Sequence, residues 1–184
     1  ACRTAFGIGM ETTVLNRGIE RLREIDNAYR GRVRTGPLTQ SSVRKEIQNA
    51  DLIIGALLSP GGRTPVVVHR DMLKTMKAGS VIVDVSIDQG GCVETSTPRT
   101  HDDPIYRVDD IIHYTVANMP GAYPRTSTLA LTNATLPWII RLTSGLESAL
   151  QSDALRKSLN LFRGKVRNRP LADAQGIPWE KEND

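Results

Sequence analysis

Two stretches of the sequence place polar side chains directly after runs of β-branched residues. Ser80 to Val85 leads into Asp88-Gln89-Gly90-Gly91, and Asp110 to Val116 leads into Asn118-Met119-Pro120-Gly121. A carboxylate can accept or give a proton near neutral pH, and an amide can orient a bound group by hydrogen bonds. Both runs have the apolar character of buried parallel strands. The sequence therefore predicts a chemical site where two strands end.

The order of the upstream elements predicts where that site lies. Apolar spacing indicates strands over 12–15, 31–35 and 51–58, with amphipathic helices over 17–29 and 40–49 between them. Strands that alternate with helices are typical of a doubly wound α/β sheet. In such a sheet ligands bind at the carboxyl ends of the strands, so we expect Asp88 and Asn118 at the binding edge.

Further helices are predicted along the rest of the chain, over 1–8, 69–77, 125–142 and 146–158. Gly79 follows the second of these where a left-handed residue is favoured, and Thr126 or Ser127 is the expected N-cap of the third. Pro137 should kink or divide that third helix. Residues 179–184 are expected to form a frayed tail.

The chain does not show the opening of a Rossmann-type domain. Such a domain begins with a strand, then Gly-x-Gly-x-x-Gly, then a helix that receives a pyrophosphate. Gly7-Ile8-Gly9 has no predicted strand before it, so we interpret it as a helix-to-strand turn. The first strand normally lies at the centre of the sheet. We therefore expect a Rossmann-type doubly wound parallel sheet that lacks its first strand and Gly-rich turn, followed by C-terminal helices. On this basis the 184 residues should be a fragment or truncated gene product.

Charge and hydropathy exclude several classes of partner. The net charge is +4, but acidic residues interleave with the arginines between Arg17 and Arg34, as on a solvated helix, so no nucleic-acid role is expected. No apolar run approaches the roughly 20 residues that span a bilayer. We expect no membrane role and a cytosolic location.

The two cysteines, Cys2 and Cys92, are too few for a disulfide framework and lack metal-ligand spacing. No metal is expected. Cys92 follows the Gly90-Gly91 turn, where a reactive thiol is conceivable, but a small residue packed in a loop is the favoured interpretation.

Two sequence stretches resemble a known family, namely VDVSIDQGGCVETSTPRTHDDPIY and IIHYTVANMPGAYPRTSTLALTNATLP. They are similar to the nicotinamide-binding domain and closing helix of alanine dehydrogenase, a family related to the NAD-binding domain of proton-translocating transhydrogenase. The likeness is looser over 13–78, and 159–167 resembles the family's C-terminal return strand. The resemblance to this family implies a truncated dinucleotide-binding domain over 1–124. Residues 125–184 would be the hinge helix and return segment of a missing substrate domain.

The resemblance also implies an activity and a site. The activity is the reversible NAD-dependent oxidative deamination of L-alanine to pyruvate and ammonium, in a homo-oligomer. Asp88 matches a catalytic aspartate, and Asn118 and Met119 match a turn over the nicotinamide and the substrate. The residues expected to contact the cofactor are Asn16, Ala56, Leu57, Val85, Ser86, Ile87, Asp88, Val116, Asn118 and Met119.

Three residues have competing interpretations. Asp88 could instead cap its own turn. His113 lies in mid-strand, which favours a packed core histidine over a catalytic base, and His101 lies in a solvated turn.

The chain departs from the family pattern in two places. An acidic residue normally ends the second strand and binds the ribose hydroxyls, but here Asn16 stands there, followed by Arg17. NAD is expected from the family, while NADP is not excluded. The family's substrate-binding arginine and lysine and its catalytic histidine belong to an N-terminal domain outside these residues. The chain alone is therefore expected to be inactive. The alternatives are a noncatalytic nucleotide-binding remnant, an interaction partner of an intact paralogue, or the NAD-binding module of a transhydrogenase.

Overall fold

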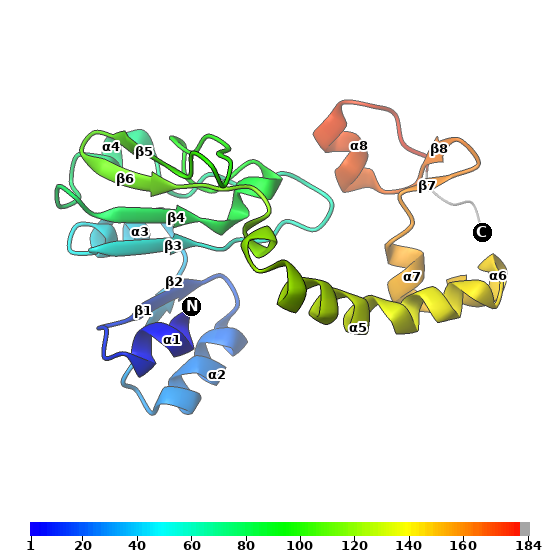
Figure 1. The fold of residues 1–184 in the computed structure, drawn as a ribbon, viewed down its shortest axis with the longest axis horizontal. Coiled ribbons are helices and arrows are strands. Elements are labelled where there is room, and N and C mark those ends of the chain that lie inside the picture. The colour runs from blue at the N-terminus through cyan, green and yellow to red at the C-terminus, as the bar shows by residue number, and fades with distance from the viewer. Residues whose placement is uncertain (181–184) are drawn as a thin grey trace. The chain divides into compact units, whose positions relative to one another are not determined.

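The computed structural model describes residues 1–180 (Figure 1). The chain divides into two compact units, one formed by 1–57 and 65–117 and the other by 58–64 and 118–184. Most of the tail predicted over 179–184 lies outside the described residues.

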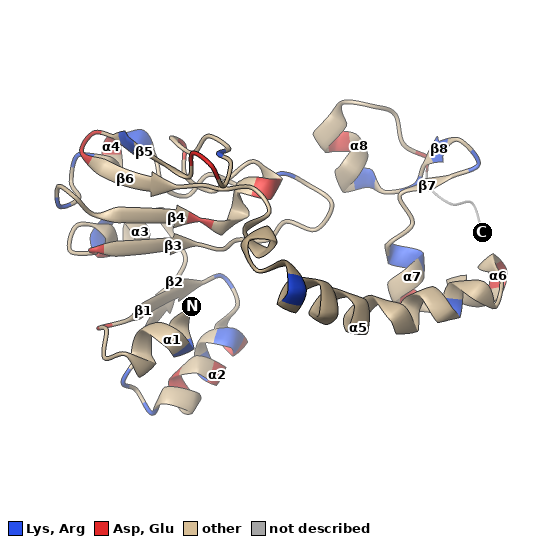
Figure 2. Cartoon of the chain, in the orientation of Figure 1, with Lys and Arg blue, Asp and Glu red and all other residues tan. Residues whose placement is uncertain are grey.

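The first unit alternates strands and helices as its sequence predicts. The elements before the site are α1 (Cys2–Gly7), β1 (Thr13–Asn16), α2 (Ile19–Tyr29), β2 (Arg34–Pro37), α3 (Gln40–Ile47), β3 (Leu52–Gly55) and α4 (Arg70–Leu73). Those that follow are β4 (Val81–Asp84), β5 (Ile105–Val108) and β6 (Ile111–Tyr114). Arginines interleave with acidic residues on α2, consistent with a solvated face (Figure 2).

The strands form two separate sheets. β1 pairs with β2 in parallel, and the second sheet has the order β3-β4-β6-β5. β3, β4 and β6 are parallel, with Val83 of β4 opposite Tyr114 of β6. The prediction that the runs over 80–85 and 110–116 are parallel strands is confirmed, and these strands are neighbours.

One strand at the edge of the larger sheet was not predicted. β5 pairs with β6 in antiparallel orientation through a two-residue loop, Asp109-Asp110. Both aspartates have positive φ, 49° and 64°, which is the conformation of the hairpin turn that matches strand twist. The sheet is therefore parallel apart from this added edge strand.

An apolar core joins the helices to the larger sheet. Its buried members are Val43, Ile47, Val68, Met72, Leu73, Met76, Ile82, Cys92, Val93 and Ile111. Burying each aliphatic side chain of this kind contributes about 1.5–3 kcal/mol. Thr39 begins α3, because its hydroxyl accepts a hydrogen bond from the N–H of Ser42 (3.1 Å). The core includes Ile82 of β4 and Ile111 of β6, so it holds these two strands in place.

Three predicted boundaries in this unit are wrong, and one of them is the end of β3, which lies at Gly55 rather than residue 58. α4 ends at Leu73 rather than residue 77, because the N–H groups of Thr75 and Met76 bond to carbonyls three residues back and tighten the chain into turns. Gly79 is left-handed (φ 83°) as predicted, but its N–H bonds to the carbonyl of Asp110 and not to the helix. β2 begins at Arg34, three residues later than expected.

The second unit is helical with one small hairpin. Its elements are the 3₁₀ turn η2 (Met119–Ala122), α5 (Pro124–Thr143), α6 (Leu146–Leu150), α7 (Asp153–Lys157), β7 (Leu161–Phe162), β8 (Lys165–Val166) and α8 (Arg169–Gln175). The segment 159–167, which resembles the family's return strand, contains two short strands, β7 and β8, that form an antiparallel hairpin about Arg163-Gly164, both with positive φ. None of the helices described is long and apolar enough to cross a membrane.

The predictions for α5 are corrected in two respects. The helix begins at Pro124, where the missing proline N–H costs nothing, and Tyr123 precedes it without a side-chain cap. The N-cap expected at Thr126 or Ser127 is therefore wrong, and the Ser127 hydroxyl donates instead to the carbonyl of Pro120 (2.8 Å). Pro137 does not divide the helix, which is continuous to Thr143.

The open strand edges predict how the 184-residue chain behaves alone. β1 and β3 are each paired on one side only, and the side chains of Leu52 and Ile54 on β3 are 38% and 40% exposed. Unpaired edges with apolar side chains favour association. We expect no sharp cooperative thermal transition from a monomer, but a broad transition or self-association. Calorimetry combined with analytical ultracentrifugation tests this. A sharp melt of a monomer contradicts it.

Candidate functional site

A buried carboxylate organises the carboxyl end of β4. Asp84 is fully buried, and its oxygens accept hydrogen bonds from five groups. The donors are the backbone N–H groups of Ser86 (3.1 Å), Cys92 (2.9 Å) and Val93 (3.2 Å), the hydroxyl of Ser96 (2.7 Å) and the thiol of Cys92 (3.4 Å). Such a set satisfies a charge that would otherwise be costly to bury. Asp84 therefore holds the loop after β4 in one conformation.

That loop is a 3₁₀ turn, η1 (Val85–Gln89), which ends in two left-handed glycines. Gly90 and Gly91 have φ of 95° and 80°, and their N–H groups bond back to the carbonyls of Ile87 and Ser86 (both 3.0 Å). A Cβ added at Gly91 would lie 2.8 Å from Asp84 Oδ2. Both the backbone angle and the close approach of the carboxylate require glycine at 91.

The turn leaves one carboxylate exposed at the edge of the sheet. Asp88 is exposed, and Val85, on the same turn, is 44% exposed. Asp84 caps the start of the turn by accepting from the N–H of Ser86. The arrangement leaves an acid and an apolar side chain at the carboxyl edge of a parallel strand, where doubly wound sheets bind ligands.

Other predicted cofactor contacts lie around this turn. The Ser86 hydroxyl accepts from the N–H of Leu57 (2.8 Å) and donates to its carbonyl (2.9 Å), which ties the segment after β3 to η1. Ala56 is exposed and Leu57 half-buried. The side chains of Ser86 and Ile87 are buried, so these residues could contact a ligand through their backbone only.

The end of β6 is held by a segment from the preceding loop. Arg99 forms an isolated parallel bridge with Val116, and the Thr115 hydroxyl donates to the carbonyl of Thr97 (2.5 Å). Val116 is completely buried and could offer a ligand only its backbone. Asn118 opens the second unit with φ of 53°, a left-handed conformation that asparagine tolerates, and Met119 begins η2.

Asn16 lies at the end of β1, where the family pattern expects an acid. Its side-chain oxygen accepts from the N–H of Gly18 (2.9 Å) and so shapes the turn into α2. Arg17 beside it is exposed. The position thus carries an amide and a neighbouring cation and no carboxylate.

His113 is a core residue, as expected. It is fully buried, its Nδ1 lies 3.1 Å from the Ile111 carbonyl oxygen, and its Nε2 lies 2.8 Å from the Thr95 hydroxyl. Burial lowers the pKa of His113 below its usual value, so the imidazole is neutral at pH 7. The carbonyl can only accept, so Nδ1 donates and Nε2 accepts. His101 lies in an exposed turn.

Cys92 is packed and unreactive. It is buried to 1% exposure, and burial, together with the Asp84 carboxylate, raises the pKa of its thiol to about 12. A thiol of this kind stays protonated and is a poor nucleophile. The interpretation of Cys92 as a small packed residue is confirmed.

Sequence reasoning did not find Asp84. The signal was present, because an aspartate within the β-branched run Val81-Ile82-Val83-Asp84-Val85 must be paired if the run is buried. Its partners come from residues 92, 93 and 96, which no local pattern links to it.

The strand order, and the polar turn at the carboxyl edge of the sheet, define the class of the first unit. It is a doubly wound α/β domain with an added antiparallel edge strand, of the class that binds nucleotides at its carboxyl edge. A family model described as "Alanine dehydrogenase/PNT, C-terminal domain" matches residues 1–169. The chain belongs to this family.

Individual relatives agree with that assignment. The chain is 50% identical over 181 residues to the alanine dehydrogenase of Halomonas elongata, covering 97% of this chain and 49% of that protein. It is 44% identical over 181 residues to the alanine dehydrogenase of Mycolicibacterium smegmatis, with the same coverage. A solved L-alanine dehydrogenase superposes with a TM-score of 0.79 at 38% identity, over 95% of this chain and 48% of that one.

A more distant neighbour shares the fold alone. A transhydrogenase from Sinorhizobium meliloti superposes with a TM-score of 0.60 at 23% identity, over 68% of this chain and 35% of that one. The chain spans about half the length of the alanine dehydrogenases it matches.

Proposed function

We propose that this chain provides the nicotinamide end of an alanine dehydrogenase, with NAD as cofactor and Asp88 as its catalytic carboxylate. The observation that carries the proposal is the exposed Asp88 on a turn that the buried Asp84 fixes at the carboxyl edge of β4. The alanine dehydrogenases of Halomonas elongata and Mycolicibacterium smegmatis, at 50% and 44% identity, support the reaction type.

The residues of the turn fit a dinucleotide. Gly90, the exposed one of the two left-handed glycines after η1, leaves backbone without a side chain at the edge, which allows close approach of a ligand. The exposed Val85 gives an apolar surface on which a flat ring can lie. The nicotinamide, when bound, would accept or return the hydride. The roles of Asn118 and Met119 toward the ring and the substrate stay predictions from the resemblance.

The roles proposed for this chain in the reaction are proton transfer and orientation of the bound groups. Oxidation of alanine requires a group that takes a proton from the amine or from the attacking water. The carboxylate of Asp88 can do this if substrate is held within hydrogen-bond reach. Cations for the substrate carboxylate would come from polypeptide outside these residues. Cytosolic location and homo-oligomeric assembly belong to the proposal by family resemblance.

A chimera tests the proposed function. The part of the Halomonas elongata enzyme that this chain does not cover is joined to residues 1–184, and NADH formation from L-alanine and NAD is followed by absorbance. We expect the chimera to be active and the 184-residue chain alone to be inactive. A folded chimera without activity would favour a noncatalytic nucleotide-binding role, and activity of the chain alone would contradict the proposal.

The choice between NAD and NADP has its own prediction. We expect the chimera to bind NAD more tightly than NADP, and Asn16→Asp to widen that preference about tenfold, because a carboxylate accepts from the ribose hydroxyls and repels a 2′-phosphate. Arg17→Gln should weaken NADP binding selectively. Calorimetric titration of each variant with both dinucleotides measures this. Tighter binding of NADP than NAD by the parent would reverse our choice.

A further inference from the structure

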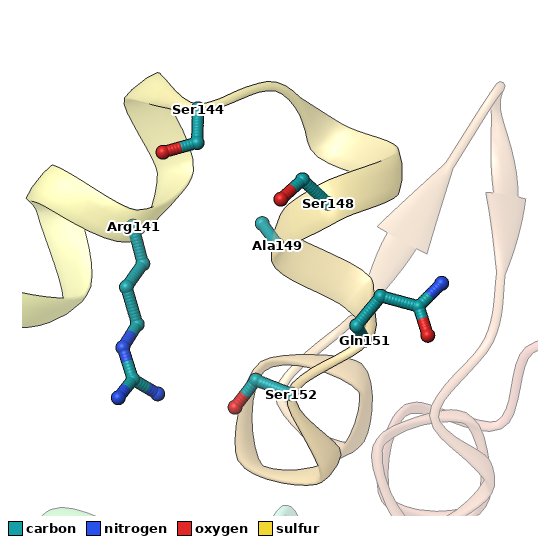
Figure 3. A pocket seen from close by; sticks show the side chains of 6 residues that line it. All are labelled: Arg141, Ser144, Ser148, Ala149, Gln151 and Ser152. Atoms are coloured by element: carbon teal, nitrogen blue, oxygen red, sulfur yellow. The ribbon is translucent and has the colours of Figure 1, made fainter.

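A polar cavity, open to solvent and lined mostly by exposed side chains, lies at the corner formed by α5, α6 and α7 in the second unit. Its volume is about 370 Å³, within the range of small-ligand sites. It is lined by Arg141, Ser144, Ser148, Ala149, Gln151 and Ser152 (Figure 3). Among these residues one is a cation and none is acidic.

The lining residues come from the ends of three helices. Arg141 lies in the last turn of α5 and Ser144 directly follows it, Ser148 lies in α6, and Ser152 has extended backbone directly before α7. In Figure 3 the Arg141 guanidinium extends into the opening, and the hydroxyls of Ser148 and Ser152 point toward the side from which it enters. The buried methyl group of Ala149 forms the wall between them, while the Gln151 amide points away.

The polar groups of the cavity are not used by the fold. Within residues 1–180, the side chains of Arg141, Ser144, Ser148 and Ser152 make no hydrogen bond or ion pair with another protein group. Ser152 precedes α7 but its hydroxyl does not cap that helix. The guanidinium lies over the ring of Trp138, 5.2 Å from its centroid, which leaves its N–H groups available.

Two acidic residues adjoin the cavity lining in sequence: Glu147, which is exposed and precedes Ser148, and Asp153, which is already paired. Asp153 follows Ser152, but Arg156 (2.8 Å) and Lys157 (2.6 Å) bind its carboxylate and hold its pKa below the usual range. A cation in the last turn of α5 also interacts favourably with the partial negative charge of the carbonyl groups at the C-terminal end of the helix. That role accounts for an arginine at this place but not for the hydroxyls of Ser148 and Ser152, which point toward the side from which it enters.

We propose that this cavity binds a tetrahedral oxyanion of the phosphate class. A guanidinium donates two parallel hydrogen bonds to such an anion, and hydroxyls donate to its remaining oxygens. The anion could be free phosphate or the phosphate group of a small monoester, which present the same oxygens. This site is separate from the turn that carries Asp88 and does not rest on the proposed alanine dehydrogenase activity.

Titration with anions tests the site. Inorganic phosphate and glycerol 3-phosphate are added, at constant ionic strength, to the 184-residue chain and to the chimera, with chloride and acetate as controls. The fluorescence of Trp138, beside Arg141, and calorimetry report binding. We expect saturable binding of at least one phosphate compound, and its relative affinity identifies the source. Acetate should bind at least tenfold more weakly.

Variants locate the binding. Arg141→Gln should weaken phosphate binding at least tenfold, and Ser148→Ala or Ser152→Ala a few-fold each. Arg125→Gln is the matched control, since Arg125 is the other charged residue of α5 and lies outside the cavity. Circular dichroism checks that α5 persists in each variant. Failure of both phosphate compounds to bind, or equal losses in Arg141→Gln and Arg125→Gln, overturns the proposal.

Discussion

Replacing Asp88 by asparagine in the chimera should lower kcat for alanine-dependent NAD reduction by about 10³-fold. Asparagine has nearly the same shape as aspartate but cannot accept a proton at neutral pH. Because Asp88 is exposed and Asp84 caps the turn, the substitution should leave η1 and its two glycines in place. The loss should therefore appear in the chemical step and not in folding.

Binding measurements separate a catalytic role from a structural one. The dissociation constant for NADH should change less than threefold in Asp88→Asn, since the dinucleotide contacts proposed for the turn are apolar and backbone contacts. Single-turnover kinetics should show the slow step to be hydride transfer. Asp102→Asn is the matched control, because Asp102 is also exposed and lies in a loop of the same unit.

Two outcomes would contradict the assignment of Asp88. Retention of more than a tenth of the parent kcat would show that proton transfer uses another group. A loss of NADH affinity equal to the loss of activity would show that Asp88 supports the binding site and not the reaction.

The parts of the fold that the sequence predicted are those specified by local pattern. β4 and β6 were found because each is a run of β-branched residues that must be buried on both faces. Asp88 was singled out because it follows such a run and precedes two glycines. Its exposure agrees with what local sequence can specify, namely a polar residue on a turn.

The parts that were missed depend on tertiary structure or on unusual turn residues. β5 is joined to β6 by two aspartates in left-handed conformations, which lack the Asn-Gly or Gly-Gly signature of such turns. Pro137 was expected to kink or divide α5, and it does not divide the helix, which continues on both sides of it. The strands divide into two sheets, β1-β2 and β3-β4-β6-β5, where a single sheet lacking its first, central strand was expected.

Substitution of Asp84 by alanine in the chimera should cost about 3–5 kcal/mol of unfolding free energy. It leaves the N–H groups of Ser86, Cys92 and Val93 buried with no carboxylate to accept them, and each unsatisfied group costs about 1–3 kcal/mol. Against a total stability of about 5–15 kcal/mol, this loss is large. Urea unfolding followed by circular dichroism measures it.

Two further variants, Asp84→Asn and the control Asp102→Ala, are compared with Asp84→Ala. Asp84→Asn keeps one acceptor oxygen but introduces an amide N–H₂ facing donors, so its cost should be smaller than that of Asp84→Ala but clearly measurable. Asp102→Ala should change the unfolding free energy by less than about 0.5 kcal/mol, because Asp102 is exposed. Equal stability of Asp84→Ala and the parent would show that the loop after β4 does not need its carboxylate. Asp88 would then need another explanation for its place at the edge of the sheet, since the hydrogen bonds to Asp84 are what connect the turn to the buried end of the strand.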